Sequence, residues 1–381
     1  MSLRRAVFWI HLTVGVTAAI VIFTMAVTGV VLTYEAQINR WALREYRADP
    51  SSPGTGPLVL DELIRRVNGE QPAGLVTSVA LQRDPREPAL FRLDGGATVY
   101  VDRFTGESLG DGNTPTRRFL RSVMYWHRWF ALEGEYRIIG RTFTATANLG
   151  FLFLIVSGFY LWWPRIRSRV AWMQALCFRR GLGGRARNFN WHSVIGFWSA
   201  VPLAIIVASG ATISYEWAGD LVYRLMGEAP PPRTSPQPIE SVVRGDISVT
   251  TDPATPLVEF QALADKAAAQ APGWQAITVR LPESIRDPVV VAVDRGTGRQ
   301  PSMSEEFLFN RSTGDFVGRA GYPTFSRGQK ARRWLRFAHT GEVYGAIGQT
   351  VAGVVSLGVA VMVWTGLAMS WRRFFRSARR R

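Results

Sequence analysis

The sequence predicts an α-helical membrane protein with four transmembrane helices in two parallel-repeat halves, each half carrying a small α+β domain outside the membrane. Three observations predict this architecture. The chain contains four long runs without charge, its basic residues gather beside one end of those runs, and its second half repeats the pattern of its first half.

The four charge-free runs set the number of predicted spans. They cover residues 6–34, 142–164, 188–215 and 343–371 and contain 29, 23, 28 and 29 residues. Because about 20 consecutive apolar residues cross the hydrocarbon core of a bilayer, each run is long enough to span it. The first run is longer than the roughly 7–15-residue core of a secretory signal and no A-x-A cleavage pattern follows it, so we expect a retained helix.

The basic residues set the predicted orientation. The first five residues carry two arginines, the loop 165–187 carries seven and the tail 372–381 carries six, and none of these segments contains an acidic residue. The rest of the chain holds 30 basic and 29 acidic residues, so the net charge of +16 reflects membrane topology and predicts no nucleic-acid partner. The arginine-rich composition suggests a multi-pass protein of the bacterial inner (cytoplasmic) membrane. We expect both termini in the cytoplasm and segments 36–141 and 216–342 in the periplasm.

The charge-free runs repeat in pairs. In the first and third runs, a histidine is followed by glycine after four residues, by a hydroxyl residue after 17 and by tyrosine after 23. The matching residues are His11, Gly15, Thr28 and Tyr34 in the first run and His192, Gly196, Ser209 and Tyr215 in the third. The second and fourth runs match through Gly140, Ser157-Gly158 and Trp163 and through Gly348, Thr365-Gly366 and Trp371. Such a parallel repeat places equivalent residues about a pseudo-twofold axis along the membrane normal.

The two outer segments also resemble each other. Each opens with a helix-compatible stretch, 60–72 or 260–272, and continues with alternating apolar residues that predict strands. Each then contains a hairpin signature, "VYVDRFTGESLG" (99–110) or "FLFNRSTGDFVG" (307–318), whose glycine can adopt a positive φ. The predicted segments are transmembrane helix 1 (1–35), outer domain 1 (36–116), an interfacial helix with transmembrane helix 2 (117–165), a basic cytoplasmic loop (166–187), transmembrane helix 3 (188–216), outer domain 2 (217–330), transmembrane helix 4 with its preceding segment (331–371) and a basic cytoplasmic tail (372–381).

All four histidines lie at ends of the predicted spans, two on each side. His11 and His192 occupy matching positions about five residues inside the cytoplasmic ends, and His127 and His339 precede the second and fourth spans on the outer side. Ionisable residues at membrane depth are candidates for function, with an amphipathic interfacial role as the competing explanation for each one alone. The matching glycines of the repeat are Gly140, 13 residues after His127, and Gly348, nine residues after His339. The outer pair is therefore less regular than the inner pair.

Two facing imidazoles on each side favour one kind of metal site. Zinc takes three or four protein ligands, often with cysteine or carboxylate among them, whereas the single cysteine is Cys177 and no acidic residue stands near the inner histidines. Haem iron needs only two axial ligands, and the absence of CxxCH excludes c-type haem. The pattern therefore predicts two haem b groups per chain, with His11 and His192 as axial ligands of one and His127 and His339 as axial ligands of the other.

Arginines beside these histidines are candidates to pair with haem propionates. Arg128 and Arg336 flank the outer pair. Arg5 and Arg187 flank the inner pair, where setting the membrane topology is the competing explanation. The sequence identifies no catalytic side chain.

With these residues in view, the chain resembles the PepSY-associated transmembrane family and, within it, the FoxB-type bacterial ferrisiderophore reductases. The resemblance covers essentially the whole chain and rests on the paired histidine spans, the ending "HTGEVYGAIGQT…WTGLAMSWRR" and the duplicated D/N-R-x-T-G-D/E hairpin. It implies that each outer domain is PepSY-like. It also implies a haem-dependent ferric-siderophore reductase, which passes electrons outward and releases iron(II) in the periplasm.

The electron donor and two alternative functions stay open. The inner segments hold no GxGxxG between a strand and a helix, so a Rossmann-type nicotinamide or flavin site is not expected. The donor is then a membrane quinol or a cytoplasmic reductase protein. The alternatives to a reductase are a siderophore or iron transporter of the inner membrane and a non-enzymatic PepSY regulatory membrane protein.

Overall fold

The computed structural model describes residues 2–50, 56–70, 75–163, 169–232, 256–284 and 287–375. The chain forms two compact units. The helical unit comprises Met1–Glu35, Phe119–Met226 and Ala331–Arg381, and the sheet unit comprises Ala36–Arg118 and Gly227–Lys330. Each unit is built from segments that lie far apart in the sequence.

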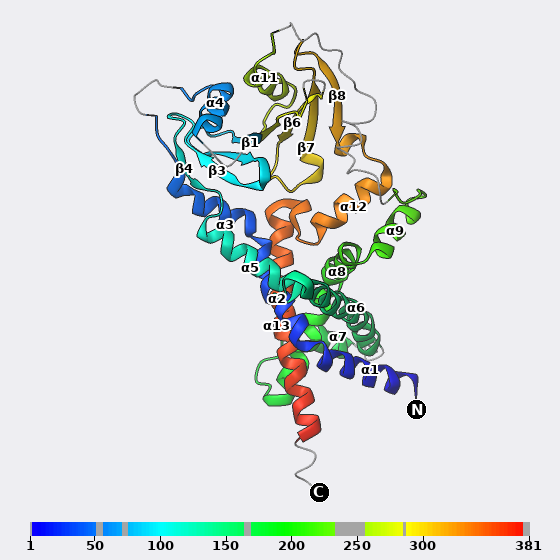
Figure 1. Ribbon diagram of the computed structural model, residues 1–381. Helices are drawn as coiled ribbons and strands as arrows, with labels where there is room; N and C mark the ends of the chain where they lie inside the picture. The colour runs from blue at the N-terminus through cyan, green and yellow to red at the C-terminus, as the bar shows by residue number, and fades with distance from the viewer. Residues whose placement is uncertain are drawn as a thin grey trace. The chain divides into compact units, whose positions relative to one another are not determined.

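Five long helices form the helical unit (Figure 1), namely α1 (Leu3–Thr17), α2 (Ala19–Thr33), α6 (Arg137–Trp162), α8 (Gly184–Ser214) and α13 (Gly345–Phe375). Further elements flank them: α5 (Pro115–Trp129), η3 (Gly134–Tyr136), α7 (Arg169–Leu176), α9 (Glu216–Leu225), α12 (Arg327–Ala338) and η7 (Glu342–Tyr344). Among the described residues, the helices containing α6, α8 and α13 are long and apolar enough to cross a membrane, and the bent pair of α1 and α2 makes a fourth span when taken together. The protein is therefore a multi-helix membrane-associated protein.

The first predicted span is not a single helix. Helices α1 and α2 meet at Ala18 with a bend of 63°. The hydroxyl of Thr17 donates to the carbonyls of Thr13 at 3.0 Å and Val14 at 3.3 Å, a back-bonding pattern that bends helices. The expectation of one helix over 1–35 is thus corrected to two helices joined at a bend.

The middle of the helical unit is packed with apolar side chains. Helix α13 packs against α2 and α8, and α6 packs against α8. Their buried contact cluster consists of Ile22, Ala26, Ala147, Leu203, Val355 and Val359. Because lipid is as apolar as these side chains, close van der Waals packing rather than transfer from water holds such helices together.

The sheet unit contains one eight-stranded antiparallel sheet in the order β4-β3-β2-β1-β5-β6-β7-β8. Its strands are β1 (Val76–Gln82), β2 (Ala89–Leu93), β3 (Thr98–Val101), β4 (Ser108–Asp111), β5 (Ala276–Arg280), β6 (Val289–Asp294), β7 (Ser304–Phe309) and β8 (Phe316–Gly321). The sequence predicts two small domains, 36–116 and 217–330. The structure instead joins the two sets of strands where β1 pairs with β5, with Val79 opposite Val279.

Helices α4 (Leu60–Glu70) and α11 (Phe260–Gln270) contribute their apolar faces to the core of this sheet. Their first turns cap each other. The carboxylate of Asp61 accepts the backbone N–H groups of Phe260 and Gln261, both at 2.9 Å, and the side-chain oxygen of Gln261 accepts the N–H of Leu60 at 3.0 Å. These bonds satisfy N-terminal donors that a helix cannot pair internally. The helices predicted in 60–72 and 260–272 are confirmed over Leu60–Glu70 and Phe260–Gln270.

Both predicted hairpins are present, as β3–β4 and β7–β8. In each turn, a polar side chain accepts a hydrogen bond from the backbone N–H of the residue two positions later. Asp102 accepts from Phe104 at 2.7 Å, and Asn310 accepts from Ser312 at 2.8 Å. The glycines that follow, Gly106 and Gly314, have φ of 78° and 71°, the left-handed region that a residue with a Cβ rarely adopts. The remaining short elements of this unit are α3 (Glu35–Ala42), η1 (Leu43–Tyr46), η2 (Asp94–Gly96), η5 (Pro301–Met303) and η6 (Tyr322–Thr324).

Candidate functional site

The four histidines fall into two groups in the helical unit. His127, at the C-terminal end of α5, and His339, directly after α12, lie with ring centroids 6.2 Å apart and ring planes at 67°. The predicted outer pair is therefore brought together. Burial, and after it the neighbouring His339, lower the pKa of His127 to about 3 and thus favour the neutral ring.

The unequal intervals after His127 and His339 do not disturb this pair, because the extra residues form a loop. After His127 the chain leaves α5 through Phe130 and Ala131, which have φ of 53° and 58°. Gly140 then packs against the backbone of Trp129, two residues after His127. In the other half, Gly348 packs in the same way against the backbone of Gly341, two residues after His339. The four additional residues therefore lie between Trp129 and Gly140, outside the paired geometry.

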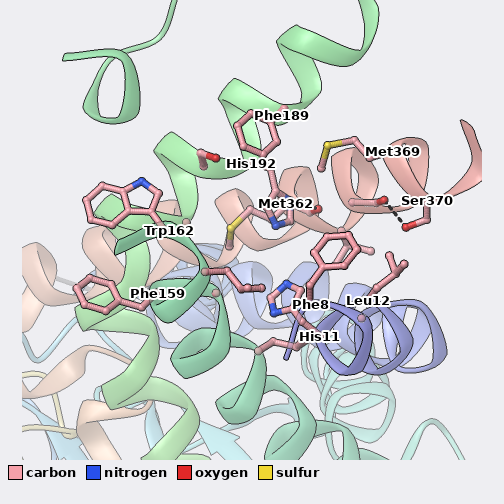
Figure 2. Close-up of a pocket in the computed structure, with 18 of the residues that line it drawn as sticks. Phe8, His11, Leu12, Phe159, Trp162, Phe189, His192, Met362, Met369 and Ser370 are labelled. Atoms are coloured by element: carbon pink, nitrogen blue, oxygen red, sulfur yellow. Dashed lines mark hydrogen bonds between the residues drawn. The ribbon is translucent and has the colours of Figure 1, made fainter. Parts of the chain in front are cut away.

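The inner histidines line one cavity of about 980 Å³. Helices α1, α6, α8 and α13 supply its walls, with His11 on α1 and His192 on α8. Figure 2 shows large apolar side chains around the two imidazoles, among them Phe8, Phe159, Trp162, Phe189 and Met362. Four glycines of these helices also line the space: Gly15, Gly158, Gly196 and Gly366. The cavity has the size of a small-molecule or cofactor site and combines apolar walls with few polar groups.

Each histidine places its Nδ1 atom against a hydroxyl group on a different helix. The four Nδ1–Oγ pairs are His11–Ser157 at 2.8 Å, His127–Thr28 at 3.0 Å, His192–Thr365 at 3.2 Å and His339–Ser209 at 3.3 Å. Three of the rings have a backbone oxygen as a further partner. These are Met25 for His127, Met362 for His192 and Ile206 for His339, the last two at 3.0 Å and 2.8 Å.

The partners of Nδ1 indicate the tautomer of the imidazoles. A backbone oxygen only accepts, so His127, His192 and His339 carry the proton on Nδ1 and the lone pair on Nε2. The four hydroxyl groups also lie within hydrogen-bond distance of a backbone carbonyl of their own helix: Thr28 to Thr24 at 2.6 Å, Ser157 to Phe153 at 2.6 Å, Ser209 to Ile206 at 2.8 Å and Thr365 to Val361 at 2.9 Å. Donation from Ser157 to this carbonyl leaves its oxygen to accept from Nδ1–H of His11, which gives the same tautomer. Within the described ranges, no hydrogen bond to Nε2 is formed by any of the four.

A glycine follows each of these hydroxyl residues and leaves room for the ring. A Cβ added at the glycine would lie 3.2–3.5 Å from Cε1 of the imidazole in every case. The four hydroxyl–glycine pairs are Thr28-Gly29, Ser157-Gly158, Ser209-Gly210 and Thr365-Gly366. The sequence shows these pairs as elements of the repeat, but their contact with the histidines becomes evident only in three dimensions.

The arginines proposed from sequence differ in their placement. The guanidinium of Arg128 lies 4.7 Å from the Trp129 ring, and burial together with Arg336 and other nearby arginines lowers its pKa. Arg128 and Arg336 thus form a positive group beside the outer pair. Arg5 lines the inner cavity, whereas Arg187 is not among its lining residues and lies 6.0 Å from the Trp191 ring.

Further arginines line the inner cavity that sequence reasoning did not single out: Arg4, Arg179, Arg185 and Arg373. No carboxylate can neutralise them from nearby in the chain, since residues 1–34, 136–215 and 343–381 contain no Asp or Glu. The cavity therefore combines two imidazoles with a positive lining, and no carboxylate is among its described lining residues.

The donor set of both sites fits a metal that brings most of its own ligands. Among the described residues, no group of three or more His, Cys, Asp or Glu side chains could hold a bare metal ion. Two imidazoles bonded to one metal at about 2 Å each have ring centroids roughly 6 Å apart, in agreement with the 6.2 Å between His127 and His339. A hydrogen bond from Nδ1–H to a hydroxyl or carbonyl is the usual support for a metal-ligating histidine.

Comparison with known proteins identifies a family for the chain. A family model described as the PepSY-associated TM region matches residues 8–373. A search among curated proteins finds no match.

Proposed function

Because the chain belongs to the family of the PepSY-associated TM region, we propose that it is an inner-membrane di-haem b protein that carries electrons outward to reduce ferric siderophores. The observation that carries this proposal is the presence, in one helical unit, of two histidine pairs whose Nε2 atoms have no hydrogen bond from the described residues. Haem iron takes two axial imidazoles, which is the number that each site offers.

The apolar packing between the inner and outer histidine pairs supports electron transfer rather than passage of ions. His192 and Ser209, the partner of His339, lie 17 residues apart on α8, about 25 Å along the helix. The apolar cluster of α2, α6, α8 and α13 lies between them along the bundle. A charged or hydrated solute crossing this cluster would lose its hydration without compensation, which argues against a siderophore or iron transporter.

The side chains have distinct roles in this proposal. The imidazoles of His11 and His192, and those of His127 and His339, would hold one haem each through Nε2. Arg128 and Arg336 would pair with the haem propionates at the outer site, as the arginines of the inner cavity would there. When bound, haem supplies a one-electron carrier at each site.

The direction of transfer follows from the charge pattern. The arginine-rich ends of the chain and the basic loop favour a cytoplasmic location, which places His11 and His192 near the cytoplasm and the sheet unit in the periplasm. Electrons enter from a membrane quinol or a cytoplasmic reductase protein. One electron converts a bound iron(III) chelate to iron(II), which the hard oxygen ligands of a siderophore hold less tightly.

The test uses the full chain in sealed lipid vesicles that contain dithionite. Ferrioxamine B and the iron(II) indicator ferrozine are added outside, and the absorbance of the iron(II) complex is followed. We expect iron(II) outside vesicles with the wild-type protein and none with His192→Ala or with protein-free vesicles. Equal rates in wild-type and protein-free vesicles would overturn the proposal, and radioactive iron accumulating inside the vesicles would favour the transporter instead.

A further inference from the structure

We infer that the four hydroxyl–glycine pairs are positioning devices that fix the tautomer and the orientation of the histidines and thereby set the electron-donating strength of each imidazole. The inference rests on the proposed function and concerns residues that touch the imidazoles rather than the cofactor. The pairs are Thr28-Gly29, Ser157-Gly158, Ser209-Gly210 and Thr365-Gly366.

Each pair ties a histidine across a helix interface. Ser157-Gly158 on α6 holds His11 of α1, and Thr365-Gly366 on α13 holds His192 of α8. The other two pairs reach histidines outside the long helices. Thr28-Gly29 on α2 holds His127 of α5, and Ser209-Gly210 on α8 holds His339 after α12. The same arrangement on four different helices indicates a common requirement of the four rings rather than a local packing solution.

The hydroxyl supplies the chemical part of the device. Because its own proton is donated to a backbone carbonyl, its oxygen accepts from Nδ1–H and excludes the opposite tautomer. Such an outer hydrogen bond raises the basicity of the ligating nitrogen. A more basic ligand stabilises the ferric state, so removal of the hydroxyl is expected to raise the midpoint potential.

The glycine supplies the steric part. A methyl group at Gly29, Gly158 or Gly366 would lie 3.4–3.5 Å from the Cε1 atom of the ring, in contact on the edge beside Nδ1. At Gly210 the space is tighter, with Cε1 of His339 at 3.2 Å and Oδ1 of Asn148 at 3.1 Å. An added Cβ at this position would therefore have to displace the ring, and with it the direction of Nε2.

The four histidines do not depend equally on their hydroxyl partner. His127, His192 and His339 also have a backbone oxygen at Nδ1, which would keep accepting after the hydroxyl is removed. For His11, the Ser157 hydroxyl is the one Nδ1 partner found among the described residues. The inference therefore predicts a larger effect at Ser157 than at Thr28, Ser209 or Thr365.

The experiment measures haem content, midpoint potentials and the ferric low-spin electron paramagnetic resonance spectrum of the full chain in detergent. Ser157→Ala is compared with Ser157→Thr, which keeps a hydroxyl. Thr28→Val is compared with Thr33→Val, because the Thr33 hydroxyl donates to the carbonyl of Gly29 without touching an imidazole. We expect an upward shift of one midpoint potential in Ser157→Ala, a smaller shift in Thr28→Val, and wild-type potentials in Ser157→Thr and Thr33→Val.

The glycine arm compares a tight position with an ordinary one. Gly210→Ala on α8 places a Cβ 3.2 Å from Cε1 of His339, whereas Gly353→Ala on α13 places one 3.4 Å from the Tyr34 ring, an ordinary contact. We expect changed g values in Gly210→Ala and unchanged g values in Gly353→Ala.

The outcomes separate this inference from the proposed function. A wild-type protein without haem would overturn both. A protein that binds two haem groups but keeps both midpoint potentials in Ser157→Ala would overturn only the positioning role. Loss of one haem in Ser157→Ala together with its retention in Ser157→Thr would support the role, because the two variants differ in whether the hydroxyl is present.

Discussion

The imidazole of His127 lies 6.2 Å from that of His339, centroid to centroid, although one residue lies on α5 and the other follows α12 in the opposite half of the chain. Each ring is held at Nδ1 by a hydroxyl of a third helix, Thr28 or Ser209. The pair therefore depends on the packing of four separate segments. Its Nε2 atoms are left for a ligand, and the distance between the rings suits one metal between two nitrogens.

The two outer histidines should behave as one unit. We expect His127→Ala and His339→Ala each to lose about one haem per chain, and the double variant to lose no more than either single variant, because one iron needs both ligands. The pyridine haemochrome assay on purified protein measures this. Tyr125→Phe, on the same helix α5, should retain the wild-type content. Additive losses in the double variant would contradict a shared iron.

The close approach of α6 to the end of α5 makes Gly140 a second sensitive position. A Cβ at Gly140 would collide with the backbone carbonyl of Trp129, and backbone cannot move aside as a flexible side chain can. We expect Gly140→Ala to displace His127 and to lose the outer haem while the inner haem stays. Haem content resolved by redox titration checks this, with Gly69→Ala on α4 as a control, because nothing lies within 4 Å of a Cβ added there.

Arg128 should affect how tightly the outer haem is bound. Its guanidinium is half-buried, and burial and the neighbouring charges of Arg336, Arg137 and Arg141 all lower its pKa. We expect Arg128→Gln to speed haem loss by about 10- to 150-fold, since a charge-assisted hydrogen bond to a carboxylate contributes about 1.5–3 kcal/mol. Transfer of haem to apomyoglobin gives the rate. Arg333→Gln, whose guanidinium lies 5.4 Å from the Phe337 ring, should leave it unchanged. Equal rates for both variants would refute the carboxylate pairing.

The sheet unit offers a test that is independent of any cofactor. Asp61→Ala removes the acceptor of two backbone N–H groups at the start of α11. We expect the free energy of unfolding to fall by about 1–2 kcal/mol, as for the loss of a helix N-cap. Chemical denaturation of the full chain, followed by circular dichroism, measures the change. Asp49→Ala breaks an exposed pair with Arg86 and should cost about 0.5 kcal/mol or less.

The sequence predicts much of the helical unit because its signals are local. Charge-free runs and offsets from His11 and His192 mark the membrane helices and their matching positions without any long-range information. The bend at Ala18 is missed because no proline marks it, and the Thr17 back-bonding that accompanies it also occurs at Thr28, Ser157 and Thr365 in unbroken helices.

Other features depend on contacts between distant segments. The pairing of β1 with β5 joins residues about 200 positions apart, so alternation within each strand predicts the strands but not their shared sheet. The hydroxyl–glycine pairs are visible as a repeat, yet only the folded bundle shows that each one meets a histidine. Arg187 was a candidate by sequence proximity to His192, but the helix directs it toward Trp191 instead of the cavity.

The haem content of the wild-type protein tests the central claim most directly. The purified full chain in detergent is assayed by pyridine haemochrome, and its dithionite-reduced absorption spectrum is recorded. The account predicts about two haem b per chain and a sharp α band typical of six-coordinate low-spin iron. A protein without haem, or with a high-spin spectrum that lacks this band, would contradict it.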